Sequence, residues 1–228
     1  MNIVIKYFFI IILLGISVFS QTTAPERDFQ LWNDYQVTVP IKKSNQKKSE
    51  RVSLLFYGTL RVGRNLSHLV DERIGVGVEF RVNNLLTFTP SYIYRAAQPF
   101  EGRKEFENRL RFDFGLEKKF KTFSIKDRNR IEFRFRNSRS DSTRYRNKFQ
   151  LSIPVKNNNK EIFTPFVADE IFYEFQSKQW SRNEFSAGIS KKFNKNTTAD
   201  FYYTFQNSRG NSFKYVNIIG ISFKFKID

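Results

Sequence analysis

The sequence predicts an all-β protein that folds as a single antiparallel, up-and-down transmembrane β-barrel of about 12 strands, with 10 as the alternative. Three observations predict this class. Apolar and polar residues alternate along most of the chain, the N-terminus has the features of an export signal, and aromatic residues reach 17% although the mean hydropathy is −0.51. Such a composition suits strands with one apolar and one polar face, and it is not that of a bundle of apolar helices.

The first element is a predicted signal peptide. Lys6 supplies a positive charge, and residues 7–18 form an apolar run that only Gly15 and Ser17 interrupt. A run of about 12 residues fits a secretory signal and is too short to cross a bilayer. We expect cleavage after Ser20. The predicted organisation is a signal peptide over 1–20, a short N-terminal segment over 21–28 and a barrel over 29–228.

Strand-like segments follow one another from Phe29 to the end of the chain. The alternation has a period of two, as in strands with two different faces; in the third segment, for example, Ile74, Val76 and Val78 alternate with small or charged residues. Eleven segments are visible, over 29–39, 52–62, 73–82, 86–94, 105–116, 130–136, 144–155, 162–175, 184–193, 200–205 and 213–227. Several have the length of a tilted membrane strand, roughly 9–11 residues, and exceed the roughly 5–6 of an average soluble strand.

The connections between these segments differ in length. Asn83-Asn84 and residues 194–196 predict tight turns, whereas residues 63–72, 96–104 and 176–182 predict longer polar loops. Tight turns at one end and longer loops at the other are typical of outer-membrane barrels. Because single-chain bacterial barrels usually have an even number of strands, eleven segments indicate one strand too many or too few. Pro90 and Pro165 each remove a ladder donor within a predicted strand.

The segment over 162–175 is apolar on both faces, and its polar positions include Glu170 and Glu174. Its alternation is therefore the least clear of the eleven.

A basic cluster is predicted on the polar face of three consecutive segments. Glu105, Glu107, Asp113 and Glu132 lie among its arginines. A lipid-facing arginine near the bilayer midplane costs about 2–4 kcal/mol, so these residues should point into the lumen. The cluster consists of Arg109, Arg111, Arg130, Arg134, Arg136, Arg144 and Arg146.

Two interpretations of this cluster remain open. It could be a basic constriction that selects a small anionic solute. It could equally be an Arg–Glu–Asp network that fills and braces a narrow lumen, because barrels of about 8 to 12 strands have little free bore.

The formal net charge of +17 also raises nucleic-acid binding. The aromatic residues lie on the face opposite the arginines, and an export signal makes nucleic acid an unsuitable partner, so we expect none. The absence of cysteine excludes disulfides, thiol catalysis and zinc–thiolate sites. No other metal motif or cofactor site is visible, and we expect neither.

Catalysis has one candidate residue. His68 is the only histidine and follows Ser67 in a predicted loop. A Ser–His pair needs hydrogen-bond contact and a third group that orients the imidazole, which adjacent loop residues rarely provide. We therefore expect no enzymatic activity. A phospholipase-like enzyme acting on lipid, with His68 as base, and a soluble secreted lipocalin-like binder remain alternatives.

The C-terminal segment resembles the signal that the barrel-assembly machinery reads. Gly220, Phe223 and Phe225 have the spacing of that pattern, although Ile218 replaces its polar residue and the chain does not end on an aromatic. The resemblance implies the assembly machinery as a partner.

The exported chain also resembles a family catalogued as domain of unknown function 2490, of the Bacteroidetes type, over residues 28–226. The resemblance implies a barrel in the outer membrane of a Gram-negative cell, in contact with its lipid and lipopolysaccharide, and it supplies no activity or catalytic residues. The residues that carry it are Leu31-Trp32-Asn33, Asn108-Arg109-Leu110-Arg111, residues 144–148 with 151–154, residues 163–166 with 170–173, and residues 193–196.

Overall fold

The computed structural model describes residues 27–43, 50–100, 102–158, 160–209 and 213–227. The predicted signal peptide over 1–20 lies outside this part of the chain. No helix long and apolar enough to cross a membrane is found in the described ranges. The strands are β1 (Arg27–Lys43), β2 (Glu50–Gly63), β3 (His68–Arg81), β4 (Leu86–Phe100), β5 (Arg103–Lys119), β6 (Ser124–Arg136), β7 (Ser142–Ser152), β8 (Val155–Asn157), β9 (Lys160–Glu174), β10 (Gln179–Lys192), β11 (Thr197–Ser208) and β12 (Tyr215–Lys226).

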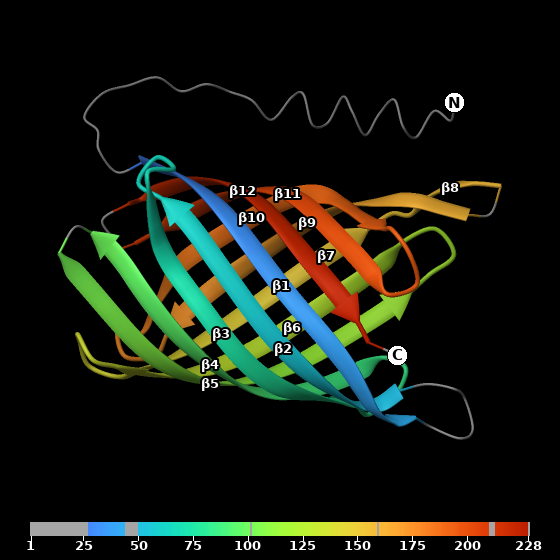
Figure 1. Cartoon of the computed structure of the whole chain (residues 1–228), viewed down its shortest axis with the longest axis horizontal. Coiled ribbons are helices and arrows are strands. Elements are labelled where there is room, and N and C mark those ends of the chain that lie inside the picture. The colour runs from blue at the N-terminus through green and yellow to red at the C-terminus, as the bar shows by residue number, and fades with distance from the viewer. Residues whose placement is uncertain (1–26, 44–49, 101, 159, 210–212, 228) are drawn as a thin grey trace.

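Eleven of the twelve strands close into one barrel, so the predicted all-β barrel class is confirmed (Figure 1). Each strand from β1 to β6 pairs with the next, β7 pairs with β9, and β9 to β12 continue the wall back to β1. The short strand β8 pairs with β9 alone. The twelve strands therefore comprise eleven in the wall and one outside it.

The seam between the first and last wall strands is parallel. Arg27 pairs with Tyr215, and the register continues without a break to Thr38 opposite Lys226. An up-and-down path through an odd number of strands makes the first and last run the same way, so the seam has to be parallel. All other wall pairs are antiparallel. The predicted barrel thus departs from uniform antiparallel pairing at this one seam.

Two prolines explain why β8 is separate from β7. The pairing of β7 with β9 stops at Ser152 opposite Phe166, and it resumes between Val155 of β8 and Phe163. Pro154 and Pro165 lie at this gap and have no N–H to donate. The β8–β9 hairpin then projects beyond the barrel rim (Figure 1). Pro90 of β4 has a similar effect, because the β3–β4 register skips from Ser91 to Phe88.

The predicted long polar loops are wrong. β2 ends at Gly63 and β3 begins at His68, β4 ends at Phe100 and β5 begins at Arg103, and β9 ends at Glu174 and β10 begins at Gln179. Several residues of the predicted loops continue the strands, and Asp71 and Arg182 among them point into the lumen. The turn over 64–67 is tight, because Asp28 of β1 accepts hydrogen bonds from the backbone N–H of Asn65 at 2.8 Å and of Arg64 at 3.2 Å.

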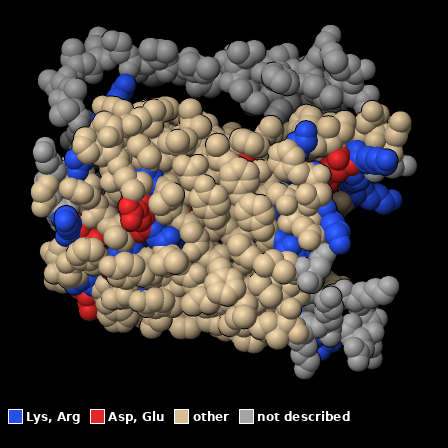
Figure 2. Space-filling model, viewed as in Figure 1, with Lys and Arg blue, Asp and Glu red and all other residues tan. Residues whose placement is uncertain are grey.

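The outer surface of the barrel is apolar and rich in aromatics. Figure 2 shows lysine, arginine, aspartate and glutamate mostly near the two ends, with an uncharged band between them. Aromatic rings stack along this band, as Phe88 does on Phe112 and Tyr35 on Phe223. The polar residues of the same strands face inward and are buried there. This polarity is the reverse of that of a soluble barrel and suits a wall that faces lipid.

Candidate functional site in the barrel lumen

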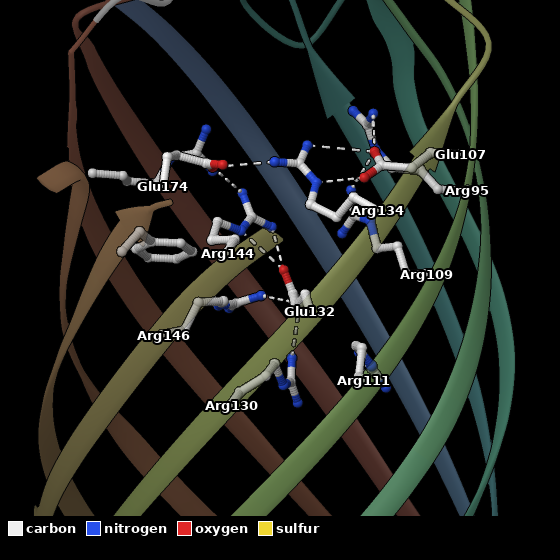
Figure 3. A network of polar contacts seen from close by, with 12 residues as sticks. Arg95, Glu107, Arg109, Arg111, Arg130, Glu132, Arg134, Arg144, Arg146 and Glu174 are labelled. Carbon is white, nitrogen blue, oxygen red and sulfur yellow. Dashed lines mark hydrogen bonds and ion pairs between the residues drawn. The ribbon is translucent and has the colours of Figure 1, made fainter. Parts of the chain in front are cut away.

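The lumen contains a network of arginines and carboxylates that spans several neighbouring strands. Its members alternate with lipid-facing residues, so the period of two along β5, β6 and β7 is what brings their charged sides together. Figure 3 shows the side chains of this network pointing toward one another inside the barrel. We call it the lumen network, and it comprises Asp71, Arg73, Arg95, Glu107, Arg109, Asp113, Arg128, Arg130, Glu132, Arg134, Arg144, Arg146, Glu170 and Glu174.

Glu107 of β5 is the first centre of the lumen network. Its side chain is 1% exposed and contacts three guanidinium groups. Arg109 donates from Nη2 at 2.9 Å, Arg134 of β6 donates from Nε, and Arg95 of β4 lies within 3.4 Å. Arg134 also donates to Glu174 of β9 at 3.1 Å, which crosses over β7. These contacts link β4, β5, β6 and β9.

Glu132 of β6 is the second centre and is completely buried. Arg144 donates to its Oε2 from Nη2 at 2.5 Å and from Nε at 2.9 Å. Arg146 donates to Oε1 at 3.1 Å, and Arg130 lies 3.7 Å from the same oxygen. One carboxylate thus holds arginines from two strands.

Two further carboxylates complete the network toward the end where the chain turns from β5 to β6. Glu170 of β9 accepts from Arg128 and from Arg146, both at 2.7 Å. Asp113 accepts two hydrogen bonds from Arg130, at 2.5 and 2.7 Å. Buried charges need such partners, because an unpaired charge in a dry interior is very costly.

Five of the seven arginines predicted from the sequence belong to this network, and two are placed apart from it. Arg136 lies at the rim, where it donates to the Ser140 carbonyl oxygen. Arg111 donates to Ser91 at 3.1 Å and lies 5.0 Å from the centre of the Tyr57 ring.

Sequence reasoning missed five other inward arginines: Arg61, Arg73, Arg95, Arg128 and Arg182. Arg61 lies over the Trp32 ring at 3.4 Å, and Arg182 lies 5.4 Å from the Phe172 ring. Arg61 and Arg73 occupy the polar face of a predicted strand, and that alternation is the signal that could have found them. Arg182 falls in a stretch that was predicted to be a loop, and Arg95 lies between a predicted strand and a predicted loop.

Every wall strand contributes a buried inward side chain to the lumen. These side chains are at most 8% exposed, although they belong to a barrel that is open at the ends. One from each strand, in order around the wall, is Trp32, Leu55, Asp71, Ile93, Glu107, Glu132, Arg144, Phe172, Glu184, Thr204 and Ile218. Buried side chains therefore enter the lumen from every side of the wall.

The lumen contains two separate cavities. The larger, of about 890 Å³, reaches the β3–β4 and β5–β6 turns. The smaller, of about 570 Å³, reaches the opposite end, where β1 and β12 begin. Trp32, Arg61 and Arg73 line both cavities and so form part of the partition between them.

His68 lies at the start of β3, exposed, and lines neither of these two cavities. The Ser67 hydroxyl is 2.7 Å from His68 Nδ1 and 2.6 Å from the Arg64 carbonyl oxygen. Among the described residues no third group contacts the other imidazole nitrogen. In the same ranges, no group of three His, Cys, Asp or Glu side chains could hold a metal ion.

The three residues of the predicted assembly signal lie on different faces of β12. Gly220 faces the lumen, where the Tyr202 ring packs against it and donates its hydroxyl to Asp34 at 3.1 Å. Phe223 and Phe225 face outward and stack on each other. The glycine thus has a packing role of its own, whatever the assembly machinery recognises.

Replacing Gly220 with Ala should destabilise the barrel by about 1–3 kcal/mol, because overpacking forces neighbours to move. A Cβ at this position would lie 2.1 Å from Tyr202 ring carbons. Urea unfolding of protein refolded in detergent, without assembly machinery, measures the effect. Gly58→Ala is the control, because its Cβ meets only Tyr35 at 3.6 Å. Adding Tyr202→Ala should remove most of the loss, and the packing role would be wrong if it did not.

The closed wall, its apolar exterior and its charged interior define the protein as a transmembrane β-barrel of the outer-membrane type. The chain belongs to the family described as "Protein of unknown function (DUF2490)", whose model matches residues 29–217.

Three solved structures are similar to this chain at low sequence identity. LpxR from Salmonella typhimurium is 9% identical with a TM-score of 0.45, over 73% of this chain and 81% of that one. The NanC porin is 9% identical with a TM-score of 0.44, over 82% and 93%. An anion-selective porin from Comamonas acidovorans is 11% identical with a TM-score of 0.39, over 75% and 55%. No curated protein sequence matches the chain.

Proposed function

We propose that this protein is an outer-membrane barrel with a sealed lumen, which serves the membrane as a structural or ligand-binding element and does not act as an open pore. One observation carries the proposal: each of the eleven wall strands contributes a buried side chain to the lumen. An open channel would leave such side chains in contact with water. The lumen network then braces the wall from inside.

The apolar exterior supports outer-membrane lipid, including lipopolysaccharide, as the surroundings of the barrel. A lipid-facing barrel also requires insertion into the membrane, so we propose the barrel-assembly machinery as a transient partner. A soluble lipocalin-like role is disfavoured, because it would leave the outward aromatic residues in water. The exposed Ser67–His68 pair lies away from the two cavities, so we propose no catalytic role for it.

Planar-bilayer recording should show no conductance steps from the wild-type protein. Insertion is checked separately by heat-modifiable gel migration of the same sample. The absence of conductance from inserted protein then indicates a sealed lumen. The comparison variant combines Arg109→Glu, Arg134→Glu and Arg144→Glu. The fraction of it that inserts should show no conductance, or a leak without anion preference. Steady anion-selective steps from the wild type, lost on charge reversal, would overturn the proposal and make the lumen network a selectivity filter.

A further inference from the structure

The smaller cavity has an unusual balance of charge. Ten arginines and four carboxylates line it, whereas eleven basic and seven acidic residues line the larger one. Its volume of about 570 Å³ is within the range of small-molecule sites, about 300–1,000 Å³. We call it the arginine cavity.

The carboxylates of the arginine cavity already have partners. Asp71 accepts from Arg73 at 2.6 Å and from Arg95 at 2.5 Å. Glu174 accepts from Arg134, and Asp28 is occupied by the backbone of the turn over 64–67. Glu107, Glu132 and Glu184, which lie outside the lining, pair with further arginines of the cavity. The positive charge without a carboxylate partner among the described residues therefore lies on Arg61, Arg136 and Arg209.

Several buried donors in the arginine cavity have no acceptor. The Nε atoms of Arg61, Arg109, Arg136 and Arg182 are buried without a hydrogen-bond partner among the described residues. The Ser142 hydroxyl is also buried without a hydrogen-bond partner among these residues. All five residues line this cavity. A buried donor without an acceptor costs about 1–3 kcal/mol, and native structures contain few of them. A ligand with several acceptor oxygens would satisfy these groups.

We propose that the arginine cavity binds a small anion that carries phosphate. Arg61, Arg109 and Arg182 come from β2, β5 and β10, so a ligand that contacts all three must present charge in several directions. The planar guanidinium group matches phosphate oxygens in pairs, which favours phosphate over a single halide ion. Trp32, with Arg61 over its face, forms part of the cavity wall.

The phosphate could belong to a soluble ester or to the headgroup of a phosphorylated lipid. Both sources present the same chemistry to the arginines, so the experiment needs one arm for each. The inference goes beyond the sealed-lumen proposal, because an anion can bind in one cavity whether or not the barrel conducts ions.

Tryptophan fluorescence provides the readout. The chain has two tryptophans, and Trp180 is 50% exposed, so Trp180→Phe leaves Trp32 as the only reporter. This protein, refolded in non-ionic detergent, is titrated with pyrophosphate. In the second arm it is placed in nanodiscs of phosphatidylcholine with or without phosphatidic acid. We expect a saturable change in Trp32 fluorescence that weakens as sodium chloride is added.

Matched arginine variants locate the site. Arg182→Gln and Arg109→Gln should each raise the apparent Kd at least tenfold, because both arginines line the arginine cavity and not the larger one. Arg111→Gln is the control and should stay within twofold, because Arg111 also has an unpartnered nitrogen but lines the other cavity. Gel migration confirms that each variant is folded.

A response to pyrophosphate supports a soluble ligand, and a response only to phosphatidic acid supports a lipid headgroup. No saturable response in either arm, or equal affinities for Arg182→Gln, Arg111→Gln and the parent protein, would overturn the inference.

Discussion

Replacing Glu132 with Gln is expected to destabilise the barrel by about 3–5 kcal/mol, the range for breaking a buried ion pair from one side. Glu132 is fully buried and holds Arg144 and Arg146 by hydrogen bonds of 2.5–3.1 Å. Glutamine has nearly the same shape, so the loss comes from the charge and not from a cavity. It leaves two guanidinium groups in a dry lumen with much of their compensation removed.

Urea unfolding in phospholipid vesicles measures this effect. Glu117→Gln is the matched control, because Glu117 contacts only Lys119 and Lys126 and its side chain is 37% exposed. Exposed pairs of this kind contribute about 0–1 kcal/mol. Equal losses for the two variants would show that Glu132 is not a centre of the lumen network.

A double variant separates charge from packing. Glu132→Gln with Arg144→Gln removes both members of the closest pair, so its loss should be smaller than the sum of the two single losses. Strict additivity would contradict a direct Glu132–Arg144 interaction. On unheated gels, a smaller fraction of each single variant should migrate at the position of the folded protein, because part of each sample fails to insert.

Much of the wall was predictable because lipid and lumen impose opposite demands on alternate residues. Phe133 faces outward and its neighbours Glu132 and Arg134 face inward, as the period of two requires. The same rule explains the error at the predicted loops. Asp71 and Arg182 lie in stretches predicted to be loops, but they are polar because they face the lumen.

The pairing inside the lumen could not be predicted, because it depends on register between strands. Arg134 reaches Glu174 across β7, and Arg128 reaches Glu170 across the same strand. No local pattern specifies such contacts. Phe172 is another example: it made its segment look apolar on both faces, and it lies inward beneath the guanidinium groups of Arg146 and Arg144.

Strand number was the other uncertain quantity. The sequence contains eleven alternating segments, and the expectation of an even number favoured adding or removing one. The structure keeps eleven in the wall and closes them through the parallel pairing of β1 with β12. Alternation reports the faces of a strand and carries no information about which strands close the ring.

An arginine placed on the lipid face should be costly in a way that depends on its depth. Leu110 lies near the middle of β5 and is 43% exposed on the outer surface, between the inward Arg109 and Arg111. Leu110→Arg should destabilise the barrel by about 2–4 kcal/mol, the cost of arginine at a bilayer midplane. Arg109 and Arg111 on either side already carry the same positive charge. The new arginine differs from them only because its side chain points toward lipid and not into the lumen.

Leu116→Arg is the matched control, since Leu116 lies on the same face of β5 and is 48% exposed. Six residues along a tilted strand correspond to roughly 15 Å of depth, enough to move from the midplane to the interface. The control should therefore lose only about 0–1 kcal/mol when both proteins are unfolded by urea in the same vesicles. In detergent micelles the difference in stability loss between the two variants should be smaller, because a micelle adapts around a charge more readily than a bilayer. Equal losses in vesicles would contradict a membrane-spanning wall, and a larger loss at Leu116 would place the centre of the apolar band elsewhere along β5.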